Sequence, residues 1–181
     1  SDYYGTGAVV LPTADRYLGV KYRWGGESPR TVFDCSGFTQ YVFAKHGIRI
    51  PRTSRAQVAA GDRVPVSLSA MKPGDLIMFA NRGRPISHVA IYAGNNRIIH
   101  SSGSGGGVRY DDLSGRRGAW YRTHKVAVRR IHGVTMAGAR GWDDHPRVNG
   151  GVIVRDFVKE LRAAGIRVDF PFDLGDFAPR P

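Results

Sequence analysis

Cysteine is almost absent from this chain, whose 181 residues include only Cys35. A single cysteine excludes a disulfide within the chain, so pairing gives no indication of the redox compartment. A lone thiol is more often a small buried apolar group than a nucleophile. Cys35 therefore needs support from its neighbours before it is read as catalytic.

Long apolar runs and repeats are also missing. No stretch of about 18 apolar residues occurs, which predicts no transmembrane segment. The first residues, Ser1 to Gly7, lack the basic and then apolar order of an export signal. The length of 181 residues predicts one main domain.

Negative charge is scarce in the first part of the chain. Residues 1–131 hold 20 Lys or Arg against 8 Asp or Glu, whereas residues 132–181 hold 7 of each class, so the net charge of +12 belongs to the first part. Such a field attracts polyanions, which include nucleic acid, acidic membrane surfaces and a wall rich in carboxylates and phosphates, and the charge alone does not choose among them. The basic residues are scattered and no zinc-finger, RNP or helix-turn-helix pattern is present, so we expect no specific nucleic-acid partner.

The apolar spacing predicts helices followed by strands, an α+β arrangement with helices packed on an antiparallel sheet. We expect the main domain to cover residues 1–131. An extension over 132–181 contains one amphipathic helix that ends at Gly165 and a strand from Ile166 to Phe170, and we expect it to pack on the domain. The expected helices are 12–18, 34–46 and 54–60, the expected strands are 76–80, 87–93, 97–101 and 125–131, and the glycine-rich segment 102–107 is expected to be a loop.

Cys35 follows Asp34, a residue type that commonly caps a helix. A thiol in the first turn meets unpaired N–H groups and the positive end of the helix dipole, which predicts a lowered pKa and a more reactive sulfur. The Cys35 amide would then help to stabilise an oxyanion, with the hydroxyl of Tyr22 as a second candidate donor. Tyr22 also has a purely structural interpretation, because a tyrosine in a loop usually just packs against its neighbours.

His88 and His100 occupy consecutive predicted strands joined around Gly94-Asn95-Asn96. If Ala93 pairs with Arg97 across a three-residue loop, the two histidines share one face of the sheet, whereas a two-residue turn at Gly94-Asn95 would separate them. The shared face is the arrangement that catalysis needs, because the base of a nucleophilic cysteine must lie next to the residue that orients it. A zinc site is the rival interpretation, but no closely spaced ligand pair supports it, so we expect no metal.

Six segments together resemble the motifs of the NlpC-type cell-wall cysteine peptidases, over roughly Leu11 to Ile131. The segments, in order, are Tyr22-Arg23-Trp24-Gly25-Gly26, Phe33-Asp34-Cys35-Ser36-Gly37-Phe38, Ile50-Pro51-Arg52-Thr53-Ser54, Lys72-Pro73-Gly74-Asp75-Leu76, Ser87-His88-Val89-Ala90-Ile91-Tyr92-Ala93-Gly94 and Ile98-Ile99-His100. Six linked motifs are far more specific than one.

The resemblance implies a papain-like fold and a reaction. Cys35 would attack a peptide carbonyl, His88 would act as base and acid, and His100 would orient His88. Relatives commonly cleave the stem peptide of peptidoglycan at the γ-linkage between D-glutamate and diaminopimelate or lysine, and Asp34 and Ser36 match positions that help to hold the free amine of L-alanine. The resemblance implies no cofactor and a periplasmic or secreted location in the bacterial envelope. We expect a monomer.

Two other functions fit the same motifs. The same triad serves acyltransferases or amidases that act on another substrate, since fold does not fix substrate. A wall-binding module without catalysis is the alternative of a different class, and it would predict a lost or blocked triad.

Overall fold

The computed structural model describes residues 5–133, which form an α+β fold of helices on a mostly antiparallel sheet. The helices are α1 (Thr6–Asp15), α2 (Cys35–Ala44), α3 (Ser54–Gln57) and α4 (Ala119–Thr123). The strands are β1 (Glu27–Ser28), β2 (Val32–Phe33), β3 (Asp62–Val64), β4 (Leu76–Phe79), β5 (His88–Gly94), β6 (Arg97–Ser102), β7 (Gly107–Asp112) and β8 (Lys125–Arg130). The predicted fold class is confirmed.

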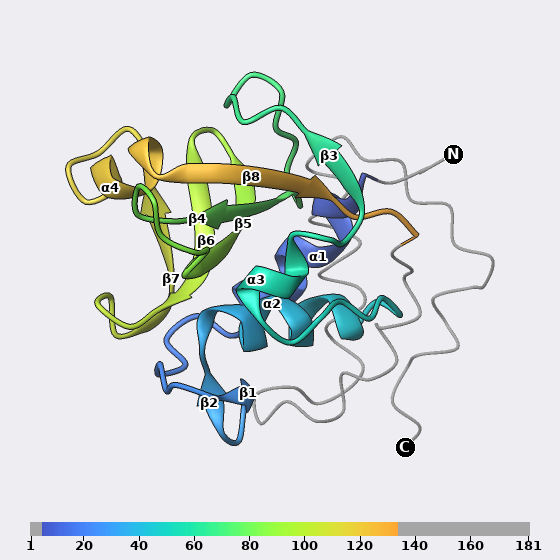
Figure 1. Ribbon diagram of the computed structural model, residues 1–181. Coiled ribbons are helices and arrows are strands. Elements are labelled where there is room, and N and C mark those ends of the chain that lie inside the picture. The colour runs from blue at the N-terminus through green and yellow to red at the C-terminus, as the bar shows by residue number, and fades with distance from the viewer. Residues whose placement is uncertain (1–4, 134–181) are drawn as a thin grey trace, which may run out of the picture.

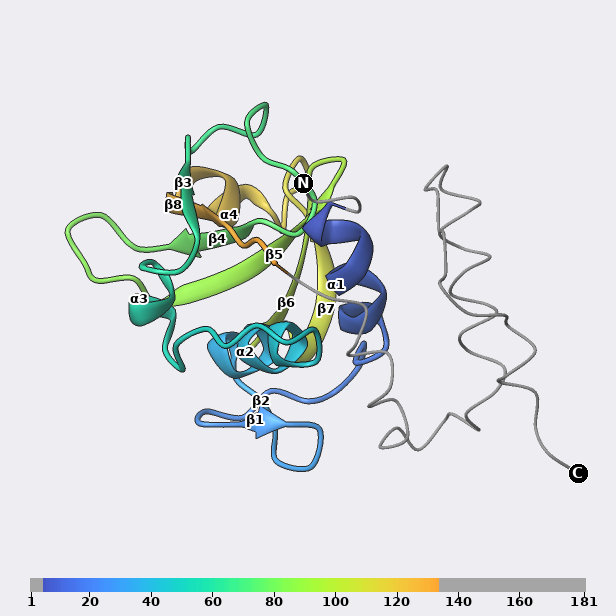
Figure 2. The same cartoon turned by 90° about the vertical axis from the view of Figure 1, so that its right-hand side faces the viewer.

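The main sheet has six strands in the order β3-β8-β4-β5-β6-β7, and every neighbouring pair is antiparallel. Helices α1 and α2 lie together on one side of this sheet, and the small β1-β2 hairpin lies beyond α2 (Figures 1 and 2). Within the main sheet, helix α2 packs mainly on β5 and β6. The start of α2 and the two central strands are therefore held against each other.

Each face of the sheet covers its own apolar core. On the helix side, Phe38 and Val42 of α2 pack with Val89, Ile91 and Ile99 of the sheet. The opposite face has a second core built from alternate strand residues, with Trp120 and Tyr121 of α4 packed against it. Members of this second core include Ile77, Phe79, Ala90, Tyr92, Ile98 and Val128. Side chains two residues apart in a strand point to the same face of the sheet. His88 lies two residues from Ala90 in β5, and His100 lies two residues from Ile98 in β6, so both histidines lie on the face of the second core.

Helix α2 begins where the sequence predicts, because Asp34 caps it. The Asp34 side chain accepts a hydrogen bond of 2.7 Å from the Gly37 N–H, and its backbone is extended as an N-cap requires. Gly37 has no room for a side chain, since a Cβ there would overlap the carbonyl oxygen of Gly26. This close approach ties the first turn of α2 to the loop before β1.

The hairpin between β5 and β6 corrects the predicted turn but confirms its consequence. Gly94 pairs with Arg97 across a two-residue turn, Asn95-Asn96, where both asparagines have positive φ angles of 50° and 58°. Asparagine tolerates that conformation, and such turns match the twist of paired strands. A register shift between Tyr92 and Gly94 inserts one residue. Ile91 therefore still pairs with Ile99, and the two histidines share a face as predicted.

Several predicted boundaries were wrong. The first helix starts at Thr6 and contains Pro12 in its interior, because burial of Val9, Val10 and Ala14 compensates for the hydrogen bond that proline removes. Helix α3 stops at Gln57, three residues short of the predicted end at 60. Strands β1, β2, β3 and β7 and helix α4 were not predicted, and the expected helix and strand of 132–181 lie outside the described residues. No helix within residues 5–133 has the length and apolarity needed to cross a membrane.

Candidate active site

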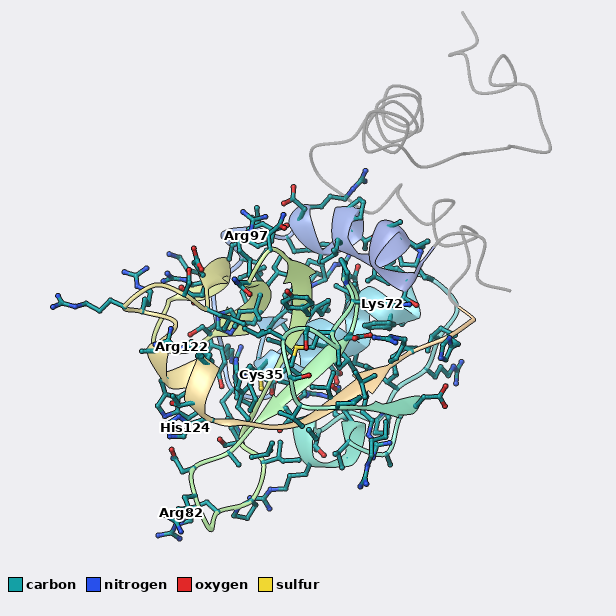
Figure 3. All side chains as sticks on the ribbon, turned by 90° about the horizontal axis from the view of Figure 1, so that it is seen from above. Cys35, Lys72, Arg82, Arg97, Arg122 and His124 are labelled. Atoms are coloured by element: carbon teal, nitrogen blue, oxygen red, sulfur yellow. The ribbon has the colours of Figure 1, made fainter. Side chains whose placement is uncertain are left out.

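Cys35 lies at the start of α2, near the middle of the fold, whereas Arg82 lies at its margin (Figure 3). The residue is 8% exposed and its thiol is free. The backbone N–H of Val89 is close enough to hydrogen-bond the sulfur and lower the thiol pKa. Because Val89 follows His88 in β5, the sulfur lies beside the end of the strand that carries His88.

The structure corrects the expected electrostatics of this thiol. Burial raises the pKa of Cys35, and the negative charge of Asp34 adds to the rise, while the N–H groups of Val89, Ser36 and Cys35 itself lower it by less. The net pKa is higher than that of an ordinary thiol. The helix N-terminus acts in the predicted direction, but loss of solvent outweighs it. The resting sulfur is therefore a thiol at neutral pH.

A chain of three side chains runs inward from His88. His88 Nε2 lies 2.7 Å from His100 Nδ1, and His100 Nε2 lies 2.8 Å from Asp111 Oδ2. Asp111 is held in turn by Arg109, whose Nη2 donates to Asp111 Oδ1 at 2.7 Å. His100 is fully buried, with no exposed surface. The predicted pair of histidines is thus brought together, with a carboxylate behind it.

The carboxylate at the end of the chain determines where the protons lie. Ionised Asp111 only accepts hydrogen bonds, so His100 must carry its proton on Nε2. The Nδ1 of a neutral His100 then accepts, so His88 must donate from Nε2. A neutral His88 consequently has its lone pair on Nδ1, the nitrogen that is free to take a proton. A carboxylate that accepts a hydrogen bond from one ring nitrogen fixes the tautomer of a histidine in the same way at other sites.

Burial keeps both rings neutral. Loss of solvent lowers the pKa of His88, His100 adds to this shift and Asp111 opposes it, which leaves the pKa at about 3. Burial also lowers the pKa of His100, although the hydrogen bond to Asp111 offsets part of this effect. For Asp111, burial raises the pKa, but His100 and Arg109 outweigh burial and leave it below its usual value. The group is therefore a carboxylate with two neutral imidazoles at neutral pH.

Asp34 and Ser36 belong to a second polar cluster around the start of α2. Arg52 binds both oxygens of the Asp34 carboxylate, at 3.0 Å and 2.9 Å, and also donates to Ser36 Oγ at 3.0 Å. Burial raises the pKa of Asp34, but the bonds from Arg52, Gly37 and Gly25 outweigh it and lower the pKa. Helix capping by Asp34 is confirmed, whereas a role for Asp34 and Ser36 in binding an amine stays a prediction.

Tyr22 lies at the edge of this cluster. Burial raises the pKa of its hydroxyl, and the neighbouring Cys35 and Asp34 raise it further, which places the phenol near both groups. Its ring also contacts the glycine loop, since a Cβ at Gly103 would lie 3.3 Å from it. Tyr22 is partly exposed, so its position fits that of an oxyanion donor, and this role stays a prediction.

Residues outside the predicted set complete the site. Asp111 and Arg109 were missed because β7 was not recognised as a strand, although Val108 and Tyr110 alternate with them in the sequence. Tyr121 of α4 packs edge-on against His100, with ring centroids 4.9 Å apart, and also lies against His88. No group of three His, Cys, Asp or Glu residues within 5–133 is arranged to hold a metal ion.

A cysteine at a helix N-terminus, packed on an antiparallel sheet that carries two linked histidines, defines the papain-like class of α+β fold. The family model for the NlpC/P60 family matches residues 19–130. The chain therefore belongs to the NlpC/P60 family.

Curated relatives agree with this assignment. The probable endopeptidase p60 of Listeria innocua is 50% identical over 107 residues, which are 59% of this chain and 22% of the relative. The bifunctional muramidase/DL-endopeptidase CwlT of Bacillus subtilis is 41% identical over 132 residues, 72% of this chain and 37% of the relative. The gamma-DL-glutamyl hydrolase of B. subtilis is 44% identical over 172 residues, 93% of this chain and 38% of the relative. The chain thus spans between about a fifth and two fifths of these relatives.

Solved structures show the same fold. An NLP/P60-family protein similar to a lipoprotein from Staphylococcus aureus is 39% identical, with a TM-score of 0.58 over 71% of this chain and 42% of that one. The peptidoglycan hydrolase RipB of Mycobacterium tuberculosis is 34% identical, with a TM-score of 0.59 over 71% of this chain and 65% of that one.

Proposed function

We propose that the chain is a cysteine endopeptidase that hydrolyses an amide bond in the stem peptides of peptidoglycan, with Cys35, His88 and His100 as the catalytic set. The observation that carries the proposal is the hydrogen-bonded chain from His88 through His100 to Asp111 beside the start of α2. The family assignment and the names of the relatives support the substrate class. The envelope of a bacterium, periplasmic or extracellular, is the location where such a substrate occurs.

The first step begins from two neutral partners. His88 Nδ1 takes the proton of the Cys35 thiol as the sulfur attacks the carbonyl carbon of the scissile amide. The resulting oxyanion is stabilised by the Cys35 amide and the Tyr22 hydroxyl. His88 then gives its proton to the leaving amine, the carbon–nitrogen bond breaks, and a thioester links the acyl part of the peptide to Cys35.

Water completes the cycle. His88 takes a proton from the water that attacks the thioester, and the thiol is restored as the new carboxylate leaves. Throughout both steps His100 holds the ring of His88, and Asp111 stabilises the positive charge that the histidine pair gains. Asp111 is a positioning residue here, because it acts through His100.

The scissile bond we propose is that between the γ-carboxyl of D-glutamate and the diamino acid that follows it. Two relatives from Bacillus subtilis carry names that refer to D,L bonds, whereas a relative from Escherichia coli is named murein DD-endopeptidase MepH and is 41% identical over 125 residues. A substrate panel must therefore contain both kinds of bond.

The test uses the single thiol of the chain. Purified wild-type protein and the Cys35→Ala, His88→Gln and Ser69→Ala variants are incubated with defined stem peptides and cross-linked muropeptides, and products are identified by mass spectrometry. Ser69 lies outside the site and serves as the matched control. We expect cleavage by wild type and Ser69→Ala, loss of at least about a thousandfold in Cys35→Ala, and a transient mass increase on Cys35 equal to the acyl fragment.

The other functions predict different products. An acyltransferase would release the acyl group onto an added amine and would give little hydrolysis. A wall-binding module would bind peptidoglycan without cleaving any peptide. Cleavage that persists unchanged in Cys35→Ala would refute the proposal.

A further inference from the structure

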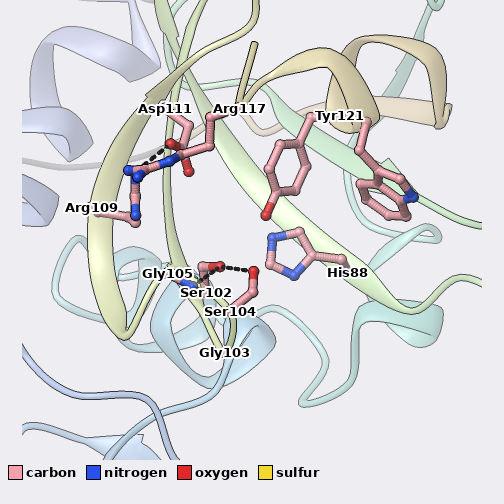
Figure 4. Close-up of a pocket in the computed structure, with 10 residues that line it drawn as sticks. His88, Ser102, Gly103, Ser104, Gly105, Arg109, Asp111, Arg117 and Tyr121 are labelled. Atoms are coloured by element: carbon pink, nitrogen blue, oxygen red, sulfur yellow. Dashed lines mark hydrogen bonds and ion pairs between the residues drawn. The ribbon is translucent and has the colours of Figure 1, made fainter. Parts of the chain in front are cut away.

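A pocket apart from the proposed active site lies where the chain leaves the described residues. The cavity at the active site, of about 530 Å³, has His88, Arg109 and Asp111 among its lining residues (Figure 4). The separate pocket measures about 350 Å³ and contains no member of the proposed catalytic set. We call it the exit pocket, because Ile131 and His132 form part of its wall. The residues that line the exit pocket are 48–51, 59–61, 131 and 132.

Apolar side chains form most of the exit pocket. Ile50 and Ile131 are buried and belong to the core on the helix side of the sheet. Pro51 and Ala59 are exposed, so the same lining continues to the surface. An apolar side chain placed here would leave water and contact the core, which favours its binding.

Positive charge borders the pocket. Arg49 lines it and is exposed, and the side chain of Arg49 has no hydrogen bond or ion pair with any of residues 5–133. The carboxylate of Asp62, in β3, is already bonded to His132 Nε2 at 2.9 Å. The charge of Arg49 therefore remains for a ligand.

Arg63 and Arg129 add two further charges beside the pocket. They lie directly opposite each other in the antiparallel pair β3-β8, where like charges repel. Arg129 lies between Ala127 and Ile131, which both pack in the core on the helix side, so Arg129 points to that face and Arg63 shares it. Neither guanidinium has an ion pair with any of residues 5–133. An anionic ligand at this edge would relieve their repulsion.

The chain itself contains a segment of complementary character. Residues 168–177 hold Asp169, Asp173 and Asp176 together with three phenylalanines, and they contain no Lys or Arg, although the whole chain has a net charge of +12. Interleaved acidic and apolar side chains match a pocket with an apolar lining and a cationic border. A polyanion without apolar groups would leave that lining uncovered.

We propose that residues 168–177 dock in the exit pocket of their own chain, with phenylalanine side chains against the apolar lining and aspartates beside Arg49, Arg63 and Arg129. Residues 133–167 join the two, and a tether of this length spans about 33 Å even as a random coil. The tether also starts at the wall of the pocket, next to His132. A tethered ligand meets its site at a local concentration of about a millimolar, which favours docking within one chain over binding of a second copy.

The experiment measures disulfide formation in the full chain, after Cys35→Ala has removed the native thiol. One protein combines Ala59→Cys in the pocket wall with Gly175→Cys in the segment, and a control protein combines Ser69→Cys with Gly175→Cys. Ala59 and Ser69 are both exposed, but Ser69 does not line the pocket. Equilibration with glutathione gives the effective concentration of the two thiols, and non-reducing electrophoresis separates bonds within a chain from bonds between chains.

We expect the effective concentration for the Ala59 pair to exceed that for the Ser69 pair by about tenfold or more, because a docked segment holds its thiol near the pocket wall. Arg49→Glu should reduce this excess to less than about twofold. Arg82→Glu makes the same change of charge at an exposed position on the margin of the fold and should leave the excess intact.

The segment is tested by a matched pair of double variants. Asp173→Asn with Asp176→Asn should reduce the excess as Arg49→Glu does, because both remove the same attraction. Asp143→Asn with Asp144→Asn removes two carboxylates outside 168–177 and should have no effect.

Three results would overturn the proposal. The first is an equal effective concentration for the two cysteine pairs, and the second is an excess that survives both Arg49→Glu and Asp173→Asn with Asp176→Asn. The third is disulfides that form only between chains, which would assign the pocket to a second copy. All three are independent of the proposed peptidase activity, because Cys35→Ala removes its nucleophile.

Discussion

Acid should destabilise this fold through His88 well before its carboxylates titrate. The unfolded chain binds a proton on this histidine below a pKa of about 6.5, whereas burial lowers the pKa to about 3 in the folded protein. Between these values the unfolded state binds one proton more than the native state, so stability falls as pH falls. The stabilisation that depends on a neutral His88 is complete above the pKa of the unfolded chain, and it is lost as pH falls towards the pKa of the folded protein.

The size of the effect follows from the same two values. Each pH unit within the window costs about 1.4 kcal/mol per histidine, so a change from pH 7 to pH 5 costs at most about 2 kcal/mol through His88. The pKa of His100 is lowered as well, and its contribution has the same sign. Asp34 and Asp111 have lowered pKa values and lose their contribution only at lower pH, as pH falls through the usual carboxylate range of about 4.

Urea unfolding at pH 7 and at pH 5 measures the difference directly. The variant His88→Gln removes the titrating ring and keeps a donor for His100, and His124→Gln removes a histidine that is stacked on Trp120, away from the chain of His88. We expect wild type and His124→Gln to lose about 2 kcal/mol or more between the two pH values, and His88→Gln to lose about 2 kcal/mol less. Equal losses in all three proteins would refute a buried, neutral His88.

Three further predictions concern the thiol, the carboxylate and the first turn of α2. Alkylation of Cys35 by iodoacetamide, followed by mass spectrometry, should be slow at pH 7 and keep rising beyond the usual thiol range of about 8.5, since only the thiolate reacts; a plateau reached below pH 7 would contradict the raised pKa. Asp111→Ala should lower kcat by about a hundredfold with little change in KM, and Asp111→Asn by about tenfold, because an amide oxygen still accepts from His100; equal loss in both would mean that the tautomer does not depend on this acceptor. Gly37→Ala should cost about 3 kcal/mol in thermal unfolding, because its Cβ would overlap the Gly26 carbonyl, whereas at Gly115 the nearest atom to a new Cβ is 3.5 Å away; similar stability of Gly37→Ala and Gly115→Ala would exclude the close packing.

Short stretches of sequence were enough to predict that Cys35 lies at the start of a helix and that His88 and His100 share one face of the sheet. Asp34 predicts the start of α2 because capping depends on a few adjacent residues, and the capping bond to Gly37 is present. The shared face of His88 and His100 follows from strand alternation, and it survived a wrong turn because the inserted residue before Gly94 restored the register. Both features depend on short stretches of sequence, so both were predictable.

The carboxylate behind the histidines was not predictable in the same way. Strand β7 reads as polar because Arg109 and Asp111 face the pocket, where an ordinary strand would have apolar residues. Sites of chemistry commonly break the pattern that identifies a strand. The raised pKa of Cys35 was missed for a related reason, since its burial depends on packing between α2 and β5, which a sequence window does not contain.

Burial acts on both members of the proposed catalytic pair in the same direction. It raises the pKa of Cys35 and lowers that of His88, so a neutral thiol and a neutral imidazole are favoured over a thiolate and an imidazolium. On the proposed mechanism, the proton must therefore move as the carbonyl is attacked. The charge of Asp111 then matters most in the transition state, when the histidine pair becomes positive. Loss of that charge should accordingly slow catalysis far more than it changes the rate at which an added reagent alkylates the resting thiol.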